Sequence, residues 1–375
     1  MSTTREVMAD AVVPLRIRLA RPYTDEAEVD AVRTVLQSGQ LTNGPAVAEF
    51  ERAFAEMHQV EHAVAMANGT VALAAMYLAE GIGPGDEVIV PSLTFISTAT
   101  SVVHVGARPV FAEVDPETYN LDPADVARRL TPRTKAIVAV HYAGQSADMA
   151  ELQAIADDAG VVLLEDAAEA HGATYQGRPV GGWGRSAMFS FTPTKNITTG
   201  EGAMVTTHDG DLAARFRLLR NHGQSSLYGH DSLGFNWRLS DIQAAIGRVQ
   251  LDRLGGILAT KTANDARIRS ALAAIPGVTP PALRPDRTHT YMLYTLQLEA
   301  GRDQVLAALR AEGIEARLYF PPAHRQQVFR ADPVRLPVTE HLADRLISIP
   351  FHARLAPTEL DEVVDALGRA VAAIR

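Results

Sequence analysis

The stretch KAIVAVHYAGQSADMAELQAIADDAGVVLLED, residues 135–166, determines the class of fold. It begins with the apolar run KAIVAV (135–140) and ends with VVLLE (161–165), and the segment 148–159 between them has the apolar spacing of an amphipathic helix. Two buried strands joined by a helix run parallel, and both faces of their sheet are covered. The stretch therefore predicts a βαβ unit of an α/β protein.

The same alternation continues on both sides of this unit. Further buried strands are predicted at 62–66, 86–90, 108–114 and 186–191. Further helices are predicted at 69–80, 94–105 and 123–130. We therefore expect a large domain, residues 1–250, with a mainly parallel sheet sandwiched by helices.

The pattern changes after about residue 240. Residues 240–275 predict one long helix or two successive helices, with Gly255-Gly256 as the possible break. A strand at 290–300, a helix at 301–313, a strand at 314–320 and a final helix from Pro357 complete an α+β pattern. These elements predict a smaller C-terminal domain, residues 251–375, on which the N-terminal segment is expected to pack.

Composition narrows the possible partners. The 375 residues include 35 Lys and Arg against 44 Asp and Glu, a net charge of −9, which argues against nucleic acid or an anionic membrane as the main partner. The chain has no cysteine, which excludes disulfides, thiol catalysis and cysteine zinc sites. The N-terminus lacks the apolar core of a signal peptide, and no apolar run is long enough to span a membrane. We expect a cytoplasmic protein without a metal site.

Ligands of an α/β sheet bind at the carboxyl ends of its strands, so the residues that follow each strand are informative. Asn68, Gly69 and Thr70 follow the strand at 62–66 and open a helix. Small residues at a helix N-terminus favour an anion such as a phosphate, although a plain helix cap has the same sequence. The motif matches neither a Walker loop nor a dinucleotide fingerprint.

Three further strand ends carry candidate residues. Phe95 follows the strand at 86–90 and could form the wall of a planar ligand or belong to the core. Asp166 follows the strand at 161–165, where a carboxylate needs a partner or a helix to cap; it and Glu165 should point to opposite faces. Ser190 and Lys195 follow the last strand. An anion site, an aromatic wall, an acid and an amine are together the groups that pyridoxal phosphate (PLP) requires.

Several motifs in the same order resemble the DegT/StrS-like aminotransferases, PLP enzymes of fold-type I. The motifs are LTNGP (41–45), PSLTFISTA (91–99), EDAAEAHGA (165–173), FSFTPTKNITTGEGA (189–203), GFNWRLSDIQAA (234–245), IEARLYFPPAH (314–324) and LPVTEHLADRLISIP (336–350). The resemblance covers nearly the whole chain from about residue 14. It implies a PLP-dependent transfer of an amino group from an amino acid, with glutamate expected, to a keto group of a nucleotide-linked deoxysugar.

The resemblance also implies roles for single residues. Lys195 would bind the cofactor covalently and shuttle a proton, Asp166 would pair with the pyridinium nitrogen, and Phe95 would stack on the ring. Glu169 stands where the family usually has a glutamine near the phenolic oxygen, so its contact with the cofactor is a departure from the common motif. A lysine at 195 favours transamination, since related sugar 3-dehydratases have histidine at that place.

The remaining implied contacts involve phosphate, partner and substrate. The phosphate of PLP would be held by Gly69, Thr70 and Ser190. Asn236 would reach that phosphate from a partner subunit, so a homodimer with a shared active site is expected. The candidates for substrate contacts are His222, Arg238, Arg317 and His324.

Other functions remain open at this point. Within the family, a cyclitol (inosose-type) ketone could replace the nucleotide sugar, and a PLP-dependent dehydratase or a non-catalytic regulator are further alternatives. An NAD-dependent dehydrogenase would share the α/β class, but it needs a glycine fingerprint after the first strand, where this chain has Asn68-Gly69-Thr70.

Overall fold

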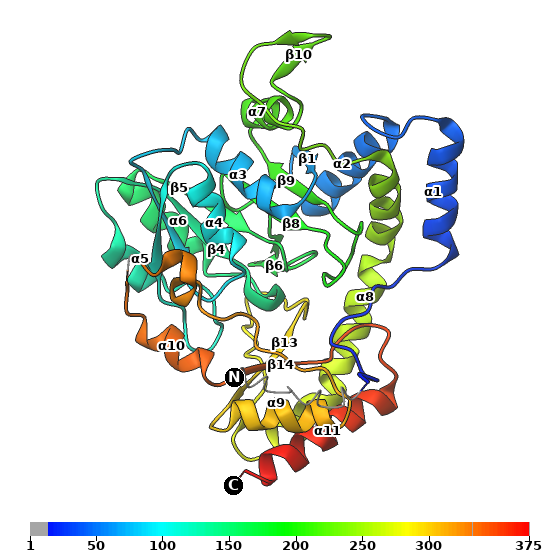
Figure 1. Ribbon diagram of the computed structural model, residues 1–375, viewed down its shortest axis with the longest axis vertical. Coiled ribbons are helices and arrows are strands. Elements are labelled where there is room, and N and C mark those ends of the chain that lie inside the picture. The colour runs from blue at the N-terminus through cyan, green and yellow to red at the C-terminus, as the bar shows by residue number, and fades with distance from the viewer. Residues whose placement is uncertain (1–13, 332, 375) are drawn as a thin grey trace, which may run out of the picture.

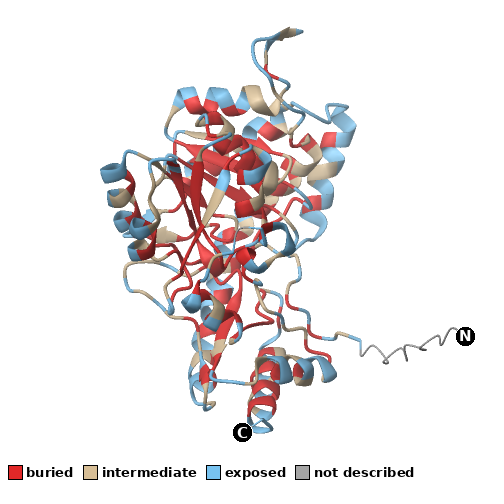
Figure 2. Ribbon diagram, turned by 60° about the vertical axis from the view of Figure 1, so that its left-hand side comes forward, coloured by how far each residue is buried: buried red, intermediate tan, exposed pale blue. Residues whose placement is uncertain are grey.

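The computed structural model describes residues 14–331 and 333–374. Its centre is a seven-stranded sheet in the order β1-β9-β8-β5-β4-β2-β3, buried between helices (Figures 1 and 2). The strands are β1 (His62–Met66), β2 (Glu87–Pro91), β3 (Arg108–Ala112), β4 (Thr134–Val140), β5 (Val162–Asp166), β8 (Ser186–Ser190) and β9 (Ala203–Thr207). The predicted α/β class with strands near the expected positions is confirmed.

The sheet is mainly parallel, with one strand in the opposite direction. β3, β2, β4, β5 and β8 pair in parallel, whereas β9 lies antiparallel between β8 and β1. β9 was not among the predicted strands. It follows the lysine loop directly and returns along β8, so Phe189 pairs with Met204 across the two strands.

Helices cover both faces because successive strand residues point to opposite sides. Val88 and Val90 face one core, together with α3, α4 and α7, while Ile89 faces the other, with α5 and α6. A third cluster joins α2 and α8 to the sheet around Phe50 and Phe54. The helices are α2 (Pro45–His58), α3 (Gly69–Ala79), α4 (Ser97–His104), α5 (Pro123–Arg129), α6 (Met149–Ala159), α7 (Gly210–Arg220) and α8 (Asp241–Ala273).

The C-terminal part has a separate core around a three-stranded antiparallel sheet, β12-β13-β14. Ile17, near the described N-terminus, forms a bridge with Ile314 and is buried in this core. The elements are β12 (Val278–Thr279), β13 (Tyr294–Leu298), β14 (Leu346–Ile349), α9 (Arg302–Ala311), α10 (Pro337–Ala343) and α11 (Pro357–Ala372). The N-terminal segment therefore lies against the C-terminal part.

α8 is a single helix of 33 residues that runs from the large sheet to the C-terminal core (Figure 1). It passes through Gly255 and Gly256 without a break, because buried residues on either side anchor the helix. Both glycines face open space, since added Cβ atoms there would meet nothing within 4 Å. Residue 250, the expected end of the large domain, lies inside α8, and the division at that residue stays a prediction. The strand predicted at 314–320 is wrong, because only Arg317 pairs with a strand, through a bridge to Ser348.

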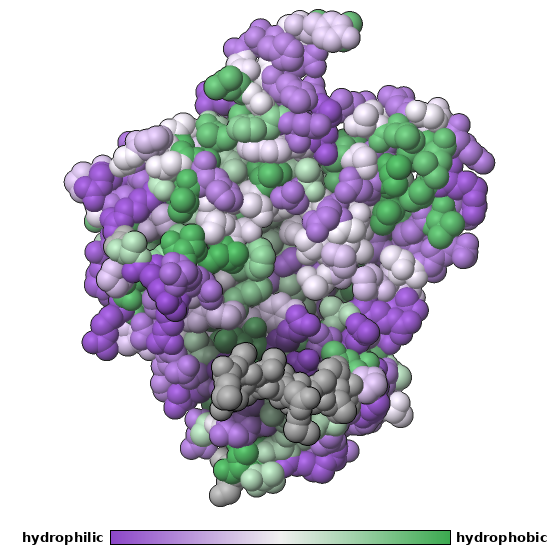
Figure 3. All heavy atoms as spheres, in the orientation of Figure 1, coloured by the Kyte–Doolittle hydropathy of each residue, from purple (hydrophilic) through white to green (hydrophobic). Residues whose placement is uncertain are grey.

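The remaining elements lie at the edges of the molecule. A hairpin with strands β10 and β11 projects from the body at the top of Figure 1, and its surroundings are open in Figure 3. These elements are α1 (Glu26–Ser38), β6 (Thr174–Tyr175), β7 (Arg178–Pro179), β10 (Gln224–Ser226), β11 (Gly229–His230) and the short 3-10 helices Tyr142–Gly144, Ala323–Arg325 and Gln327–Phe329.

Candidate active site

A pocket of about 700 Å³ opens at the carboxyl ends of the parallel strands. Seven residues predicted from the sequence line it: Gly69, Thr70, Phe95, Asp166, Glu169, Ser190 and Lys195. They come from four segments that together span more than a hundred residues of the chain. The fold therefore brings together the groups that follow separate strands in the sequence.

One end of the pocket is the N-terminus of α3. Asn68 caps this helix by accepting a hydrogen bond from the amide of Val71 at 3.1 Å, and the hydroxyls of Thr70 and Ser97 lie 2.8 Å apart. A Cβ added to Gly69 would lie 3.2 Å from Met188 Sδ and 3.5 Å from Ser190 Cβ. The missing side chain keeps the helix N-terminus open to an anion beside Ser190.

The adjacent carboxylates at the end of β5 point to opposite sides. Glu165 is buried beneath the sheet edge, where it accepts hydrogen bonds from the amides of Gly181, Trp183 and Gly184 and pairs with His141 at 3.0 Å. The strand alternation expected from the sequence is confirmed, since it turns the next residue toward the pocket.

Asp166 is one of two buried acids among the described residues that line the pocket. Its Oδ2 accepts a hydrogen bond from Thr98 Oγ1 at 2.7 Å, and its Oδ1 accepts one from the amide of Ala168 at 3.2 Å. Burial raises the pKa of this carboxyl above its ordinary value, and the Thr98 hydrogen bond opposes that rise. The described residues place no cation within 4.0 Å of this carboxylate, so a protonated ring nitrogen bound here would supply one.

Lys195 and Glu169 form an ion pair inside the pocket. Lys195 Nζ lies 3.3 Å from Glu169 Oε1, and the other oxygen of Glu169 accepts a hydrogen bond from the amide of Ala143 at 2.8 Å. Only 10% of the lysine side chain and 6% of the glutamate side chain are exposed. The carboxylate at this position is therefore matched by the lysine amine and by a backbone donor.

Aromatic side chains form the outer wall. The rings of Phe95 and Phe320 lie edge to face with centroids 5.6 Å apart, and Tyr319 lines the same side. The hydroxyl of Tyr142 donates a hydrogen bond to the carbonyl of Tyr319, which ties this wall to the large sheet. A flat apolar surface of this kind suits a planar ring.

The other predicted residues lie outside the pocket of their own chain. His222, Asn236 and Arg238 belong to the segment that carries the β10-β11 hairpin, where Asn236 pairs with Asn221 and Arg238 Nη1 donates to Asn221 Oδ1 at 2.7 Å. Arg317 is exposed and forms an ion pair with Glu315.

His324 is buried beside the pocket instead of facing it. Its Nδ1 lies 2.6 Å from Ser92 Oγ and its Nε2 lies 3.2 Å from Glu340 Oε1. Burial lowers the pKa of His324 below its ordinary value. With both ring nitrogens engaged, this histidine connects the segment after β2 to α10.

The sequence did not single out several residues that complete the pocket. Thr98 is the second residue of α4 and reaches Asp166, while Tyr142 begins a short 3-10 helix and Tyr319 lies in an irregular segment. The hydroxyl at 98 follows Phe95 by three residues, a helical spacing that could have placed both on one face. Nothing in the local sequence marks the two tyrosines.

Two kinds of site are absent from the described residues. In residues 14–331 and 333–374, no group of three or more histidine, aspartate or glutamate side chains could hold a metal ion. No helix in these ranges has the length and apolarity to cross a membrane.

The chain resembles known proteins along nearly its full length. Residues 22–368 match the DegT/DnrJ/EryC1/StrS aminotransferase family. GDP-perosamine synthase of Caulobacter vibrioides is 43% identical, covering 94% of this chain and 97% of that protein. UDP-N-acetyl-3-dehydro-alpha-D-glucosamine 3-aminotransferase of Acidithiobacillus ferrooxidans is 39% identical, covering 96% and 97%. The crystal structure of DesV from Streptomyces venezuelae, in complex with a ketimine intermediate, superposes with a TM-score of 0.90 at 36% identity, covering 96% and 99%.

Proposed function

Because the chain belongs to the DegT/DnrJ/EryC1/StrS aminotransferase family, we propose that it is a PLP-dependent aminotransferase acting on a nucleotide-linked ketosugar. The amino group comes from an amino acid, with L-glutamate as the expected donor, and the product is a nucleotide-linked amino sugar. The single observation that carries this proposal is the convergence of Lys195, Asp166 and the open N-terminus of α3 on one pocket. We propose that the protein acts in the cytoplasm.

The residues present fit the cofactor. The buried carboxylate of Asp166 lies among hydrogen-bond donors but has no cation within 4.0 Å among the described residues. The gap left by Gly69 beside Ser190 offers an anion the backbone donors of α3. When bound, PLP supplies an electron-poor ring that takes up the electrons of the broken C–H bond.

The chain's own residues then have distinct tasks. Lys195 would hold the cofactor covalently and carry a proton between the substrate carbon and the carbon attached to the cofactor ring, and Glu169 holds the lysine amine when it is free. Asp166 keeps the ring nitrogen protonated, since a carboxylate favours a proton on a base beside it. Phe95, which lines the pocket, would pack against the ring.

The charges of the pocket support a shared active site. Among its described lining residues, the acids Asp166, Glu169 and Glu201 outnumber the single cation Lys195. A cofactor phosphate and a sugar diphosphate are both anions, so this pocket needs donors from elsewhere. We propose that a second copy supplies them through the segment with His222, Asn236 and Arg238, as in a homodimer.

The projecting hairpin supports this arrangement. Leu227, Tyr228 and Leu233 are 83%, 85% and 92% exposed in the single chain. Large apolar side chains on a projecting hairpin gain stability when a partner covers them. The hairpin stands clear of the body in Figure 3.

The names of the relatives do not agree on one acceptor. The proteins with 43% and 39% identity carry names that refer to GDP and UDP sugars, so overall similarity does not select the nucleotide. A cyclitol ketone is the second candidate, because it presents the same ketone on a polyhydroxylated ring without the diphosphate, which would suit the acidic lining.

The deciding experiment combines purified protein, PLP, L-glutamate and a panel of acceptors. The panel contains 3-keto and 4-keto sugars linked to GDP, UDP and dTDP, together with an inosose, and mass spectrometry detects conversion of ketone to amine. We expect amination of one nucleotide ketosugar and none with Lys195→Ala. Amination of the inosose alone would transfer the proposal to a cyclitol aminotransferase, and amination of no acceptor would overturn it.

A further inference from the structure

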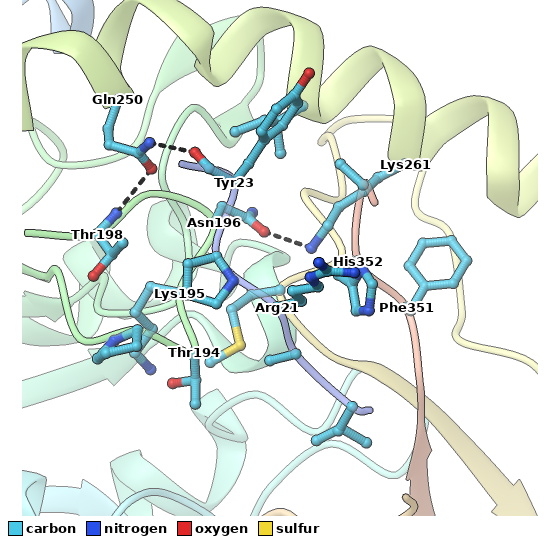
Figure 4. Close-up of a pocket in the computed structure, with 17 residues that line it drawn as sticks. Arg21, Tyr23, Thr194, Lys195, Asn196, Thr198, Gln250, Lys261, Phe351 and His352 are labelled. Carbon is cyan, nitrogen blue, oxygen red and sulfur yellow. Dashed lines mark hydrogen bonds between the residues drawn. The ribbon is translucent and has the colours of Figure 1, made fainter. Parts of the chain in front are cut away.

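A second lysine lies behind the loop that carries Lys195. Lys261, on α8, is only 4% exposed, and its Nζ lies 2.6 Å from Asn196 Oδ1 and 2.8 Å from the carbonyl oxygen of Tyr291. Figure 4 shows this contact from the helix to the loop. In the described part of the chain no carboxylate lies within 4.0 Å of this amine, so its partners are neutral oxygens.

The residue that Lys261 holds is the immediate neighbour of Lys195. The amide group of Asn196 also donates through Nδ2 to the carbonyl of Thr290 at 3.0 Å, so both ends of its amide are engaged. Thr290 in turn donates through its hydroxyl to the carbonyl of Glu169 at 3.3 Å. A chain of hydrogen bonds therefore leads from α8 through Asn196 and Thr290 to the backbone of Glu169, and Asn196 is bonded directly to Lys195 in the chain.

α8 holds the same loop at a second point. Gln250 Oε1 accepts a hydrogen bond from the amide of Thr198 at 3.3 Å, and its Nε2 donates to the carbonyl of Tyr23 at 2.6 Å (Figure 4). Gln250 and Lys261 are eleven residues apart, about three helical turns, so they lie on one face of the helix. Lys261 and Gln250 thus attach the C-terminal side of the Lys195 loop to α8, and Gln243 Nε2 adds a third contact by donating to the carbonyl of Glu201 at 2.7 Å.

Lys261 does not line the pocket that contains Lys195, Glu169 and Asp166. It lines a separate cavity of about 20 Å³ with Asn196, His352 and the backbone side of Lys195, which has room for about one water molecule. In Figure 4 the side chain of Lys195 is directed away from Lys261. Any effect of Lys261 on the chemistry must therefore pass through its two partners, Asn196 and the segment at Tyr291.

The buried position of this amine disfavours its charged form. Burial alone lowers the pKa of Lys261 to about 7. A methionine would fill nearly the same volume without that cost, so the two hydrogen bonds to Asn196 and Tyr291 are what the lysine adds here.

We infer that Lys261 is a positioning residue for Lys195, which holds the reactive lysine in register with Glu169 and Asp166 by fixing Asn196 and the segment at Tyr291. The inference deepens the proposed function, since it rests on Lys195 being the residue that reacts. It assigns to α8 a task beyond packing: the helix sets the place of the loop from behind.

The test compares Lys261→Met, Asn196→Ala and their double variant with the wild-type full chain. Tyr294→Phe is the matched control, because it removes another buried hydrogen bond to α8, from Tyr294 to Asp265 at 2.7 Å, without touching the loop. Lys261→Arg is the conservative variant. The first readout is hydrogen exchange by mass spectrometry of a peptide covering 192–202 in the protein without PLP. The second is the rate of the absorbance change when PLP binds to Lys195.

We expect exchange in that peptide to become about tenfold faster in Lys261→Met, the change that corresponds to losing one buried hydrogen bond. PLP binding should slow by a similar factor, the double variant should match the stronger single variant, and Lys261→Arg should recover part of the loss. Wild-type exchange in Lys261→Met, effects that multiply in the double variant, or the same change in Tyr294→Phe would each overturn the inference.

These readouts separate the inference from the proposed function. Exchange needs neither cofactor nor substrate, so it decides the positioning even if no ketosugar is aminated. Conversely, amination by the wild type with unchanged exchange in Lys261→Met would leave the aminotransferase in place and remove the role of Lys261.

Discussion

Lys195 Nζ and Glu169 Oε1 lie 3.3 Å apart in a pocket where both side chains are almost fully buried. Glu169 is the residue at which the sequence departs from the motif that it resembles, and in the structure it forms a charged pair with Lys195. The pair also engages the amide of Ala143. Its members are therefore expected to depend on each other for stability as well as for chemistry.

Removing the glutamate side chain should destabilise the protein without PLP. Glu169→Ala leaves the lysine amine and the Ala143 amide without their partner, which costs about 3 kcal/mol in the free energy of unfolding. Glu169→Gln keeps an oxygen for that amide and should cost about 1 kcal/mol. Urea denaturation measures both. Glu56→Ala, which breaks the exposed ion pair with Arg52, serves as control and should change stability by less than about 1 kcal/mol; equal losses in all three variants would contradict the expectation.

Neutralising the buried acid should separate activity from stability. Burial raises the pKa of Asp166, so the folded protein loses stability as pH rises above the ordinary pKa of an aspartate and the carboxyl ionises. At pH 8 the buried carboxyl is charged, and its desolvation lowers the stability of the fold. Asp166→Asn should therefore melt at the same temperature or higher in the protein without cofactor at pH 8. Its kcat should fall by about 10²–10³-fold, because the ring nitrogen loses its charged partner. A variant with wild-type kcat would contradict the role of Asp166.

A shared active site predicts complementation between two inactive variants. Lys195→Ala and Asn236→Ala should each have little activity as homodimers. In a heterodimer of the two, one site combines Lys195 of one subunit with Asn236 of the other, and the second site lacks both. The heterodimer, isolated with two different affinity tags, should show about half of the wild-type activity per dimer. An inactive heterodimer would mean that Asn236 does not act across the interface.

Acid should destabilise the fold through a buried histidine. His58 is fully enclosed by Phe54 and Phe189, and burial lowers its pKa from about 6.5 to about 4. Since the unfolded chain takes up the proton first, this contribution is intact above about pH 6.5 and is lost as pH falls toward about pH 4. The loss from this residue should reach about 2 kcal/mol between pH 6.5 and pH 5.

Urea denaturation at a series of pH values measures this slope at fixed protein concentration. His58→Phe keeps an aromatic ring in the cluster and should flatten the profile over that range. His104→Phe, at an exposed position, is the matched control. A profile of unchanged steepness in His58→Phe would assign the acid sensitivity to other groups, among them the neighbouring His171, whose pKa burial also lowers.

The sequence was informative where chemistry follows the end of a strand. Asp166, Ser190 and Lys195 could be placed in one site because parallel strands end at one edge of the sheet, which local sequence can identify. Thr98 and Tyr319 could not be placed, because their contacts depend on how segments far apart in the chain approach each other.

The errors in the fold have the same origin. The strand β9 was missed and a strand at 314–320 was predicted, yet only β9 finds a neighbouring strand along its whole length. The pair Gly255-Gly256 weakens a helix by about 1 kcal/mol per residue, which buried neighbours such as Leu254 and Ile257 outweigh. Pairing and burial, which decide both cases, are not written in the local sequence.

The continuity of α8 restricts how this protein can change over generations. Gln250 and Lys261 form hydrogen bonds to one loop from the same face of the helix. Because each residue turns the helix by about 100°, adding a single residue between them would direct Lys261 away from Asn196. Substitutions on the exposed side, including both glycines, leave that spacing intact, whereas insertions and deletions within this interval do not. An alanine inserted after Leu254 should thus impair PLP binding at least as much as Lys261→Met, so the length of this segment is under tighter constraint than its composition.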